Sequence, residues 1–154
     1  MGYTASHIHG ESIVIRKSRA SDLVNLLREA QKEYGHISWC ETVETYEQRA
    51  TPATTASEIA VRILEDYGFV TRLEDDDSIQ VIGWGGDKIG LSWDAVWNAL
   101  AQVAHADVLW IMCGEDQEVW TESLSGGERT TSVVDWVALV KQSHNKTTTE
   151  GEIL

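Results

Sequence analysis

Apolar side chains recur at helical spacing in three segments of the chain, which predicts three amphipathic helices. These helices cover residues 18–35, 57–68 and 92–106. Ser57 and Ser92 stand where the second and third helices begin, so we expect them to act as N-caps. The apolar stripes are, in chain order, Leu23, Leu26, Leu27, Ala30 and Tyr34; Ile59, Ile63, Leu64 and Tyr67; and Trp93, Val96, Trp97, Leu100, Val103 and Ala104.

Alternating or continuous apolar runs predict strands in most of the remaining chain. Residues 3–16 read as one strand, which Gly10 bends or bulges. Residues 69–84 predict a hairpin around the acidic turn of residues 74–77. The C-terminal part contributes three more strands, which fall within residues 107–113, 117–124 and 125–134.

Other segments have less regular patterns. Residues 36–48 could form a strand with an alternating face, whereas residues 49–56 hold the one proline of the chain and predict a loop. Residues 135–142 could close the fold with a helical turn. The polar residues 143–154 predict a flexible tail.

The order of these elements predicts an α+β fold, in which about three helices pack on one face of a mostly antiparallel sheet. A chain of 154 residues, of which 42% are apolar, can bury one sizeable core. We therefore expect a single α+β domain over residues 1–142, followed by the tail of residues 143–154.

The cysteines and the hydropathy pattern favour a cytoplasmic protein. Cys40 and Cys113 are the two cysteines, and they form no CxxC pair that would indicate a zinc or redox site. No segment approaches the roughly 20 apolar residues of a membrane helix. The N-terminal sequence shows no signal-peptide pattern. These patterns predict a reducing, intracellular setting.

Acidic residues dominate the charge of the chain, with 25 Asp and Glu against 12 Lys and Arg, so that the net charge is −13. Residues 41–77 carry a net charge of −7, and residues 107–128 hold six acidic residues and no Lys or Arg. Such a field repels the phosphates of nucleic acids and attracts basic proteins. Direct nucleic-acid binding is therefore disfavoured. The acidic surface serves either solubility alone or recognition of a partner, and the charge leaves both interpretations open.

The N-terminal strand carries the one pattern that could bind a metal ion. His7, His9 and Glu11 alternate, so they would share one face of a strand, and imidazole and carboxylate groups are suitable ligands for zinc or iron. The plainer interpretation is a polar strand edge, because no second cluster has ligand spacing. We expect no metal site and no cofactor.

Two further patterns favour structure over chemistry. Residues 83–90 contain glycines and a lysine before a helix, but they match neither phosphate-binding glycine motif, and a flexible connection is the simpler interpretation. Cys113 with His105 or His36 is the one Cys–His pairing worth naming for nucleophilic catalysis. Core packing of Cys113 is the simpler expectation.

Tryptophan is frequent, with seven residues, and aromatic side chains serve both cores and interface hot spots. We expect Trp97 and Trp110 in the core. Trp84 and Trp93 flank the glycine connection, and Trp120 follows an acidic turn, so these three are candidate interface residues. The expected partner-binding set is Glu74, Asp75, Asp76, Asp77, Trp84, Trp93, Glu115, Asp116, Glu118 and Trp120.

One segment resembles a known pattern. Residues 92–128 contain a helix, an apolar strand, an acidic turn that begins with glycine and glutamate, a tryptophan on the returning strand, and a glycine turn. This order is similar to that of a family of small, uncharacterised phage and actinobacterial proteins. The resemblance implies a small α+β fold and a setting as a phage accessory protein, and it implies no activity.

The sequence supports a binding role more than an enzymatic one. The first hypothesis is a non-enzymatic acidic protein-binding module, such as a phage-encoded, anti-CRISPR-like or nucleic-acid-mimicking inhibitor of a basic nucleic-acid-binding host protein in the host cytoplasm. The second is a structural or assembly protein, or a homo-oligomeric accessory protein. The third is a small metal-dependent hydrolase that uses the face of His7, His9 and Glu11.

Overall fold

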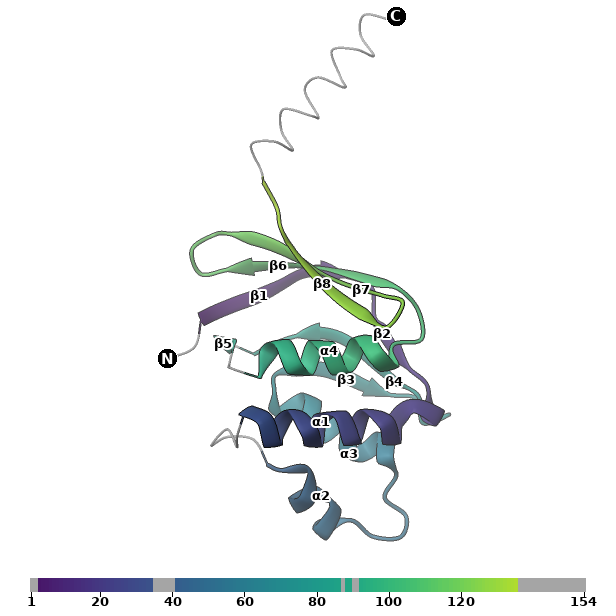
Figure 1. The fold of residues 1–154 in the computed structure, drawn as a ribbon. Helices are drawn as coiled ribbons and strands as arrows, with labels where there is room; N and C mark the ends of the chain where they lie inside the picture. The colour runs from purple at the N-terminus through teal and green to yellow at the C-terminus, as the bar shows by residue number, and fades with distance from the viewer. Residues whose placement is uncertain (1–2, 35–40, 87, 90–91, 136–154) are drawn as a thin grey trace, which may run out of the picture.

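The computed structural model describes residues 3–34, 41–86, 88–89 and 92–135, which form helices and strands in mixed order (Figure 1). The elements are β1 (Tyr3–Gly10), β2 (Ile13–Ile15), the short 3-10 helix η1 (Lys17–Arg19), α1 (Ala20–Tyr34), α2 (Val43–Arg49), α3 (Ala56–Asp66), β3 (Phe69–Leu73), β4 (Ile79–Trp84), β5 (Lys88–Ile89), α4 (Trp93–Val103), β6 (Val108–Gly114), β7 (Val119–Ser125) and β8 (Glu128–Val133).

The strands form two sheets, and every strand pair is antiparallel. The larger sheet has the order β5-β1-β6-β7-β8, and the smaller sheet has the order β2-β4-β3. The α+β class and the mostly antiparallel pairing are as the sequence predicts. The division into two sheets is a difference from the expected single sheet.

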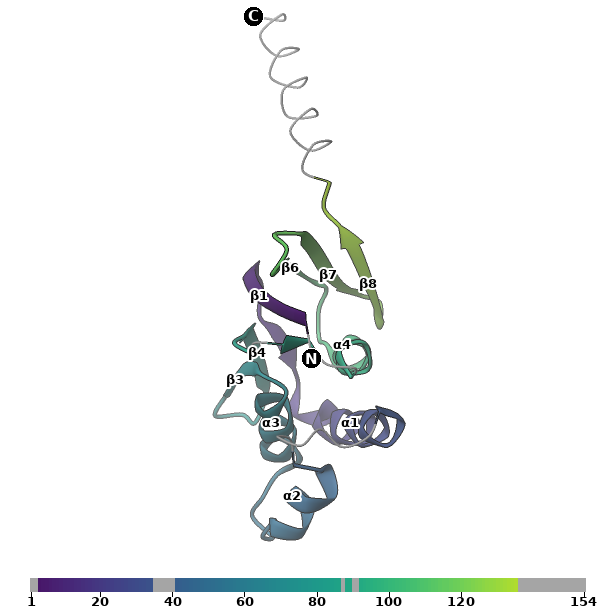
Figure 2. The same ribbon diagram turned by 90° about the vertical axis from the view of Figure 1, so that its left-hand side faces the viewer.

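The helices lie on one side of the larger sheet (Figures 1 and 2). α4 packs below this sheet, and α1 packs below α4. α3 supports the smaller sheet through β3, and α2 lies farthest from the larger sheet. No described helix covers the outer face of the larger sheet, so that face is open in the described part of the chain.

The predicted strand of residues 3–16 is divided between the two sheets. β1 pairs with β6 in the larger sheet, and β2 pairs with β4 in the smaller one. Gly10 ends β1 against the ring of Trp110, where an added Cβ would lie 2.4 Å from Cδ1 of that ring. The predicted bend therefore exists, because only glycine lets the backbone approach Trp110 this closely.

The N-terminal caps of α3 and α4 differ from the expectation. Thr55 caps α3, since its side chain accepts a hydrogen bond from the Glu58 backbone N–H at 3.2 Å. Ser57 is instead buried, and its hydroxyl donates to the Asp77 backbone carbonyl at 2.6 Å. Ser92 occupies the N-cap position of α4 as predicted, but its side chain makes no capping hydrogen bond.

The prediction of a strand within residues 36–48 is wrong for the part that the structure describes. Residues 43–49 form α2, which begins where the Thr42 hydroxyl accepts the Thr45 backbone N–H at 3.1 Å. Arg28 of α1 donates to Glu47 of α2 at 3.0 Å, which ties the two helices together. The capping threonine and this ion pair favour a helix despite the alternating pattern.

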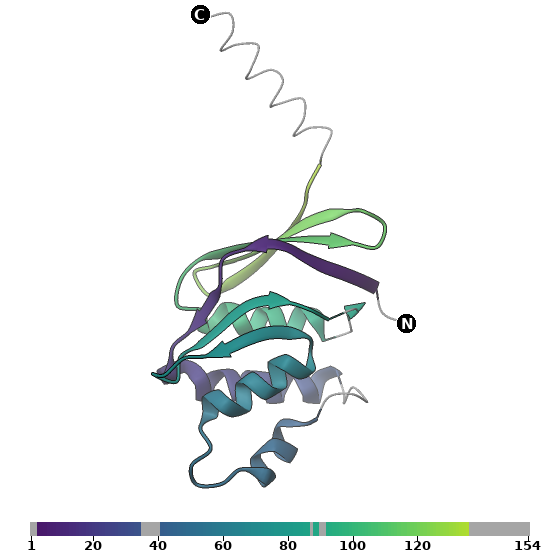
Figure 3. The ribbon, with the colours of Figure 1, turned by 180° about the vertical axis from the view of Figure 1, so that it is seen from behind.

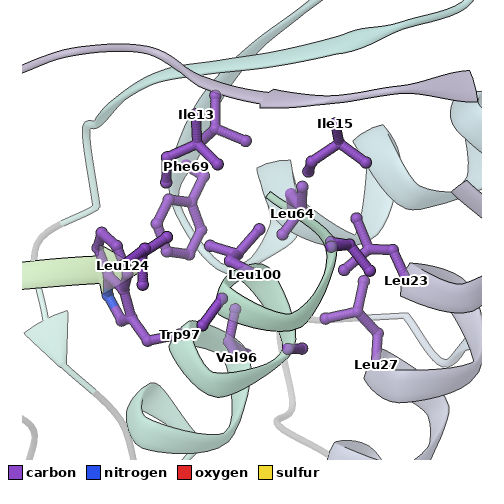
Figure 4. Packing of buried hydrophobic residues seen from close by; sticks show 14 of the residues in the cluster. Ile13, Ile15, Leu23, Leu27, Leu64, Phe69, Val96, Trp97, Leu100 and Leu124 are labelled. Carbon is purple, nitrogen blue, oxygen red and sulfur yellow. The ribbon is translucent and has the colours of Figure 1, made fainter. Parts of the chain in front are cut away.

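The core lies where α1, α3 and α4 meet the inner faces of the two sheets (Figure 4). Trp97 and Trp110 are fully buried, as the sequence predicts. Their rings meet edge to face with centroids 5.1 Å apart. Around them, Phe69 and Leu100 fill the space between α4 and the smaller sheet. This aromatic centre holds α4 against both sheets.

Several expectations lie outside the described residues. They concern residues 136–142 of the expected helical turn, the expected tail of residues 143–154, Cys40 and His36. Among the described helices, none is long and apolar enough to cross a membrane.

Candidate functional site

A cavity of about 300 Å³ opens between the first turn of α4 and the inner face of the strands β7 and β8. α4 contributes Trp93 and Asp94, and β7 contributes Val119, Trp120 and Glu122. Glu118, which directly precedes β7, and Arg129, Thr131 and Val133 of β8 complete the wall. Aromatic, acidic and aliphatic groups therefore line the same hollow.

The carboxylate of Glu122 organises the inner end of this cavity. Glu122 is fully buried. Its Oε1 accepts the indole N–H groups of Trp120 at 3.0 Å and of Trp93 at 3.4 Å. Its Oε2 accepts Arg129 Nε at 2.7 Å and the Thr131 hydroxyl at 3.0 Å. These donors replace the hydrogen bonds to water that the carboxylate loses when it is buried.

Arg129 connects this buried carboxylate to the rim. Its Nη2 donates to Glu122 Oε1 at 2.9 Å, and its Nη1 donates to Asp94 Oδ1 at 2.6 Å. Burial lowers the pKa of Arg129, but the hydrogen bonds and charges of Glu122 and Asp94 outweigh it, so the pKa is raised overall. Arg129 therefore stays charged while two carboxylates neutralise it.

The aromatic walls are held from behind as well as by Glu122. The rings of Trp93 and Trp84 meet edge to face with centroids 5.1 Å apart. Trp84 is buried, and its N–H donates to the Tyr67 carbonyl at 3.2 Å. The expectation that Trp84 serves as an exposed interface anchor is therefore corrected: Trp84 supports Trp93 from within the core.

The acidic turn of residues 115–118 stands next to the cavity. Glu118 lines the cavity itself, and the backbone N–H of Glu115 donates to the Thr4 carbonyl at 3.0 Å, which fixes the turn to β1. The side chains of Glu115 and Asp116 are exposed. No Lys or Arg of the described residues forms an ion pair with Glu115 or Asp116.

The other predicted acidic turn, residues 74–77, lies at the opposite end of the molecule (Figures 1 and 3). Glu74 pairs with Arg72 at 2.8 Å, and Asp77 pairs with Lys17 at 3.6 Å. Hydrogen bonds from Ser78 to Asp76 lower the pKa of that carboxyl group. Three of the four acids thus serve the local structure of this turn.

The predicted partner-binding residues therefore divide into two groups. The structure brings Trp93, Trp120 and Glu118 together around the cavity, and Glu115 and Asp116 lie in the adjacent turn. Trp120 is itself largely buried, with 9% of its surface exposed. The four acids of residues 74–77 do not join this group, so the two acidic turns do not form one shared face.

The candidate metal ligands do not converge. A bulge between His7 and His9 interrupts the register of β1, and the His7 ring stacks on Trp110 with centroids 4.1 Å apart. His9 and Glu11 are exposed. Within the described residues, no group of three His, Cys, Asp or Glu side chains could hold a metal ion. Burial lowers the pKa of His7, whose Nε2 is buried without a hydrogen-bond partner.

The other candidate chemistry is used for structure or is separated in space. Cys113 lies near the end of β6, whereas His105 precedes the start of that strand and hydrogen-bonds to Arg16 at 2.9 Å. Cys113 is half-buried rather than a core residue. The backbone N–H groups of Gly85 and Gly86 donate to the Gly68 carbonyl at 2.8 and 3.1 Å, so they close the end of β4 onto α3.

Gly68 shows why this closure is specific to glycine. Its φ angle is +102°, and an added Cβ would lie 2.7 Å from the Cα of Gly86. Only glycine adopts this conformation and permits this approach without strain. The glycines of residues 83–86 thus belong to the junction between α3 and the hairpin.

Sequence reasoning missed the pairing of Glu122 with Arg129. A signal was present, since Glu122 alternates with Trp120 and Leu124, whose apolar side chains mark the inward face of the strand. An acid at an inward position requires a partner, and the following strand offers Arg129. Comparisons with protein-family models, with curated proteins and with solved structures found no match to this chain.

Proposed function

We propose that this protein is a non-enzymatic acidic protein-binding module that docks a basic segment of another protein at the end formed by the cavity and residues 115–118. The observation that carries the proposal is the position of Glu115 and Asp116 beside an aromatic-walled cavity, where both are exposed and neither pairs with a Lys or Arg of the described residues. Charged rims set the association rate and the choice of partner, and aromatic groups supply most of the contact energy.

The distribution of cations supports this end over the turn of residues 74–77. Among the described residues, Arg129 is the one Lys or Arg that lines the cavity, and Glu122 and Asp94 already neutralise it. At the opposite turn, Arg72 and Lys17 pair with acids. A basic partner therefore gains more attraction at Glu115 and Asp116, with which no Lys or Arg of the described residues forms an ion pair.

The partner class that fits is a protein with a Lys- and Arg-rich surface, such as a nucleic-acid-binding protein. A net charge of −13 repels nucleic acid itself and draws such a surface from solution. Occupation of that surface by this module would compete with the phosphates of nucleic acid, which is the action of an inhibitor.

Affinity capture tests the proposal. The protein is immobilised on a resin and incubated with a cell lysate at about 50 mM salt. The retained proteins are identified before and after a wash at about 500 mM salt. We expect basic nucleic-acid-binding proteins to be retained at low salt and released at high salt. Addition of a nucleic acid should displace them, because the two compete for one surface.

A pair of charge-matched variants gives the control. The double variant Glu115→Gln, Asp116→Asn removes two acids beside the cavity, and the double variant Asp75→Asn, Asp76→Asn removes two acids at the opposite turn. Retention should fall only for the first. Equal retention by the two variants would contradict the proposed binding end. If the wild type retained no basic protein at low salt, that result would contradict the proposed function.

A second candidate function, self-assembly, is favoured by the outer face of the larger sheet. No described helix covers this face, and Leu109 on it is 50% exposed. In a chain that is 24% charged, the outward positions of β6, β7 and β8 carry one charged residue, Glu128 at the start of β8. The other outward positions are Leu109, Ile111, Cys113, Thr121, Ser123, Ser125, Thr130 and Ser132.

Two copies of this acidic chain repel each other wherever acids face acids, so a sheet face whose one acid lies at its edge is where they can meet in a symmetric pair. Light scattering over a range of protein concentrations tests this. A dimer that Leu109→Lys dissociates, while Leu73→Lys on the smaller sheet does not, would support it. A strict monomer at every concentration would exclude it.

A further inference from the structure

The cavity between α4 and the strands β7 and β8 has the chemistry of a site for one side chain of a partner. Its volume of about 300 Å³ is at the small end of ligand sites, which suits a single extended side chain more than a large ligand. The rim carries Asp94 and Glu118, and the walls carry Trp93 and Trp120.

The tryptophan rings present carbon surface to this cavity. Both indole N–H groups donate to Glu122, so the polar edge of each ring is already engaged. This shared anchor also fixes the two rings in place before any ligand arrives. A rigid aromatic wall favours a cationic group, because the face of an indole ring attracts positive charge.

The charges at the cavity exclude an anionic occupant. Arg129 donates to Glu122 and to Asp94, so an anion could bind it only by displacing a carboxylate. Among the described residues that line the cavity, the acids Asp94, Glu118 and Glu122 outnumber the one cation, Arg129. Asp94 binds Arg129 through one oxygen, and 69% of the surface of its side chain is exposed. A second cation can therefore approach the rim without facing an unpaired guanidinium.

We propose that this cavity receives an arginine side chain of the basic partner, whose guanidinium lies against the indole rings and binds the carboxylates of Asp94 and Glu118. This inference rests on the proposed function. Arginine suits the site more than lysine, because the guanidinium is planar, weakly hydrated, stacks on aromatic rings and binds carboxylates with two N–H groups. Arg129 shows that one of these carboxylates, Asp94, already binds a guanidinium.

Peptide binding separates this proposal from a simple attraction between charges. The probes are three short peptides in which glycine alternates with arginine, with lysine or with citrulline, which is the neutral analogue of arginine. Charge attraction alone gives equal affinity for the arginine and lysine peptides. We expect the arginine peptide to bind about three- to tenfold more tightly than the lysine peptide, and the citrulline peptide to bind weakly.

Val133 provides the decisive variant. It lines the mouth of the cavity and is 80% exposed, so Val133→Lys should fold normally while it places a cation at the mouth. Ile82→Lys, on the exposed side of β4, adds the same charge away from the cavity. The preference for arginine should disappear in Val133→Lys and persist in Ile82→Lys. The indole N–H resonances of Trp93 and Trp120 should shift when the arginine peptide is added.

The outcomes distinguish this inference from the proposed function. Equal binding of the arginine and lysine peptides, or an arginine preference that survives Val133→Lys, overturns the arginine site and leaves the acidic binding function in place. Absence of binding to both basic peptides at low salt overturns both. Loss of the preference in Val133→Lys alone, with thermal unfolding as in the wild type, supports the site.

Discussion

Glu122 is the one charged side chain that is completely buried in the part of the chain that the structure describes. Such a carboxylate is stable only because Arg129, Thr131 and the two indole N–H groups surround it. Removal of one partner of a buried ion pair leaves the other charge uncompensated. The position of Arg129, and with it the shape of the cavity, depends on this single side chain.

Glu122→Gln should therefore destabilise the protein strongly. The amide keeps one acceptor oxygen but loses the charge that compensates Arg129, so we expect a loss of about 2–4 kcal/mol in the free energy of unfolding. Urea denaturation measures the effect. The control Glu128→Gln, an exposed residue of β8, should change stability by less than about 0.5 kcal/mol. Similar values for the two variants would show that the buried network contributes little.

His7 gives a prediction for pH dependence. Burial lowers the pKa of His7 in the folded protein below its ordinary value of 6.5. The unfolded chain therefore binds this proton more tightly, so the contribution of His7 to stability is present above pH 6.5 and is lost as the pH falls toward the folded pKa.

The variant His7→Phe isolates this contribution, since phenylalanine can stack on Trp110 but cannot be protonated. Chemical denaturation of both proteins should show the wild type losing stability relative to His7→Phe as the pH drops below 6.5. A stability difference that is constant across this range would contradict the assignment of an unfavourably buried imidazole.

At the scale of elements, the acidic turn between β6 and β7 contains a residue in an unfavourable backbone conformation. Gln117 has a φ angle of 63°, where a side chain costs energy and glycine does not. Gln117→Gly should stabilise the protein by up to about 1 kcal/mol. Gln117→Ala, which keeps the Cβ, should give no gain. Thermal or urea unfolding of the two variants would decide, and equal stability would contradict the strain.

Helices with wide apolar stripes could be predicted from the sequence, and those without could not. α1, α3 and α4 follow their stripes of leucine, isoleucine and tryptophan. α2 was predicted as a strand, because seven residues are too few for helical spacing to differ clearly from alternation. Two contacts support its helical state, namely the Thr42 cap and the ion pair between Arg28 of α1 and Glu47.

The candidate site was predictable only in part. Trp93, Glu118 and Trp120 could be selected from composition and neighbours, and the structure places them around one cavity. Trp84 could not be recognised as a core residue, because local sequence does not reveal that Gly68 and Gly86 fold over its ring. The role of Arg129 depends on strand register, which a turn of two glycines sets.

At the scale of the whole molecule, the acids at the two ends differ in their contacts. The turn of residues 74–77 uses its acids for ion pairs and hydrogen bonds within the chain. The turn of residues 115–118 presents Glu115 and Asp116 beside the aromatic cavity. The net charge of the chain does not distinguish these two turns, whereas the ion pairs and exposure of their acids do.

The most direct test of this account is the salt dependence of binding to a peptide of alternating glycine and arginine. We predict that affinity falls at least about tenfold between about 50 mM and about 500 mM salt. The variant Glu115→Gln, Asp116→Asn should weaken binding at low salt, and Asp75→Asn, Asp76→Asn should leave it close to the wild type. Affinity that is indifferent to salt, or equal losses in both double variants, would contradict the account.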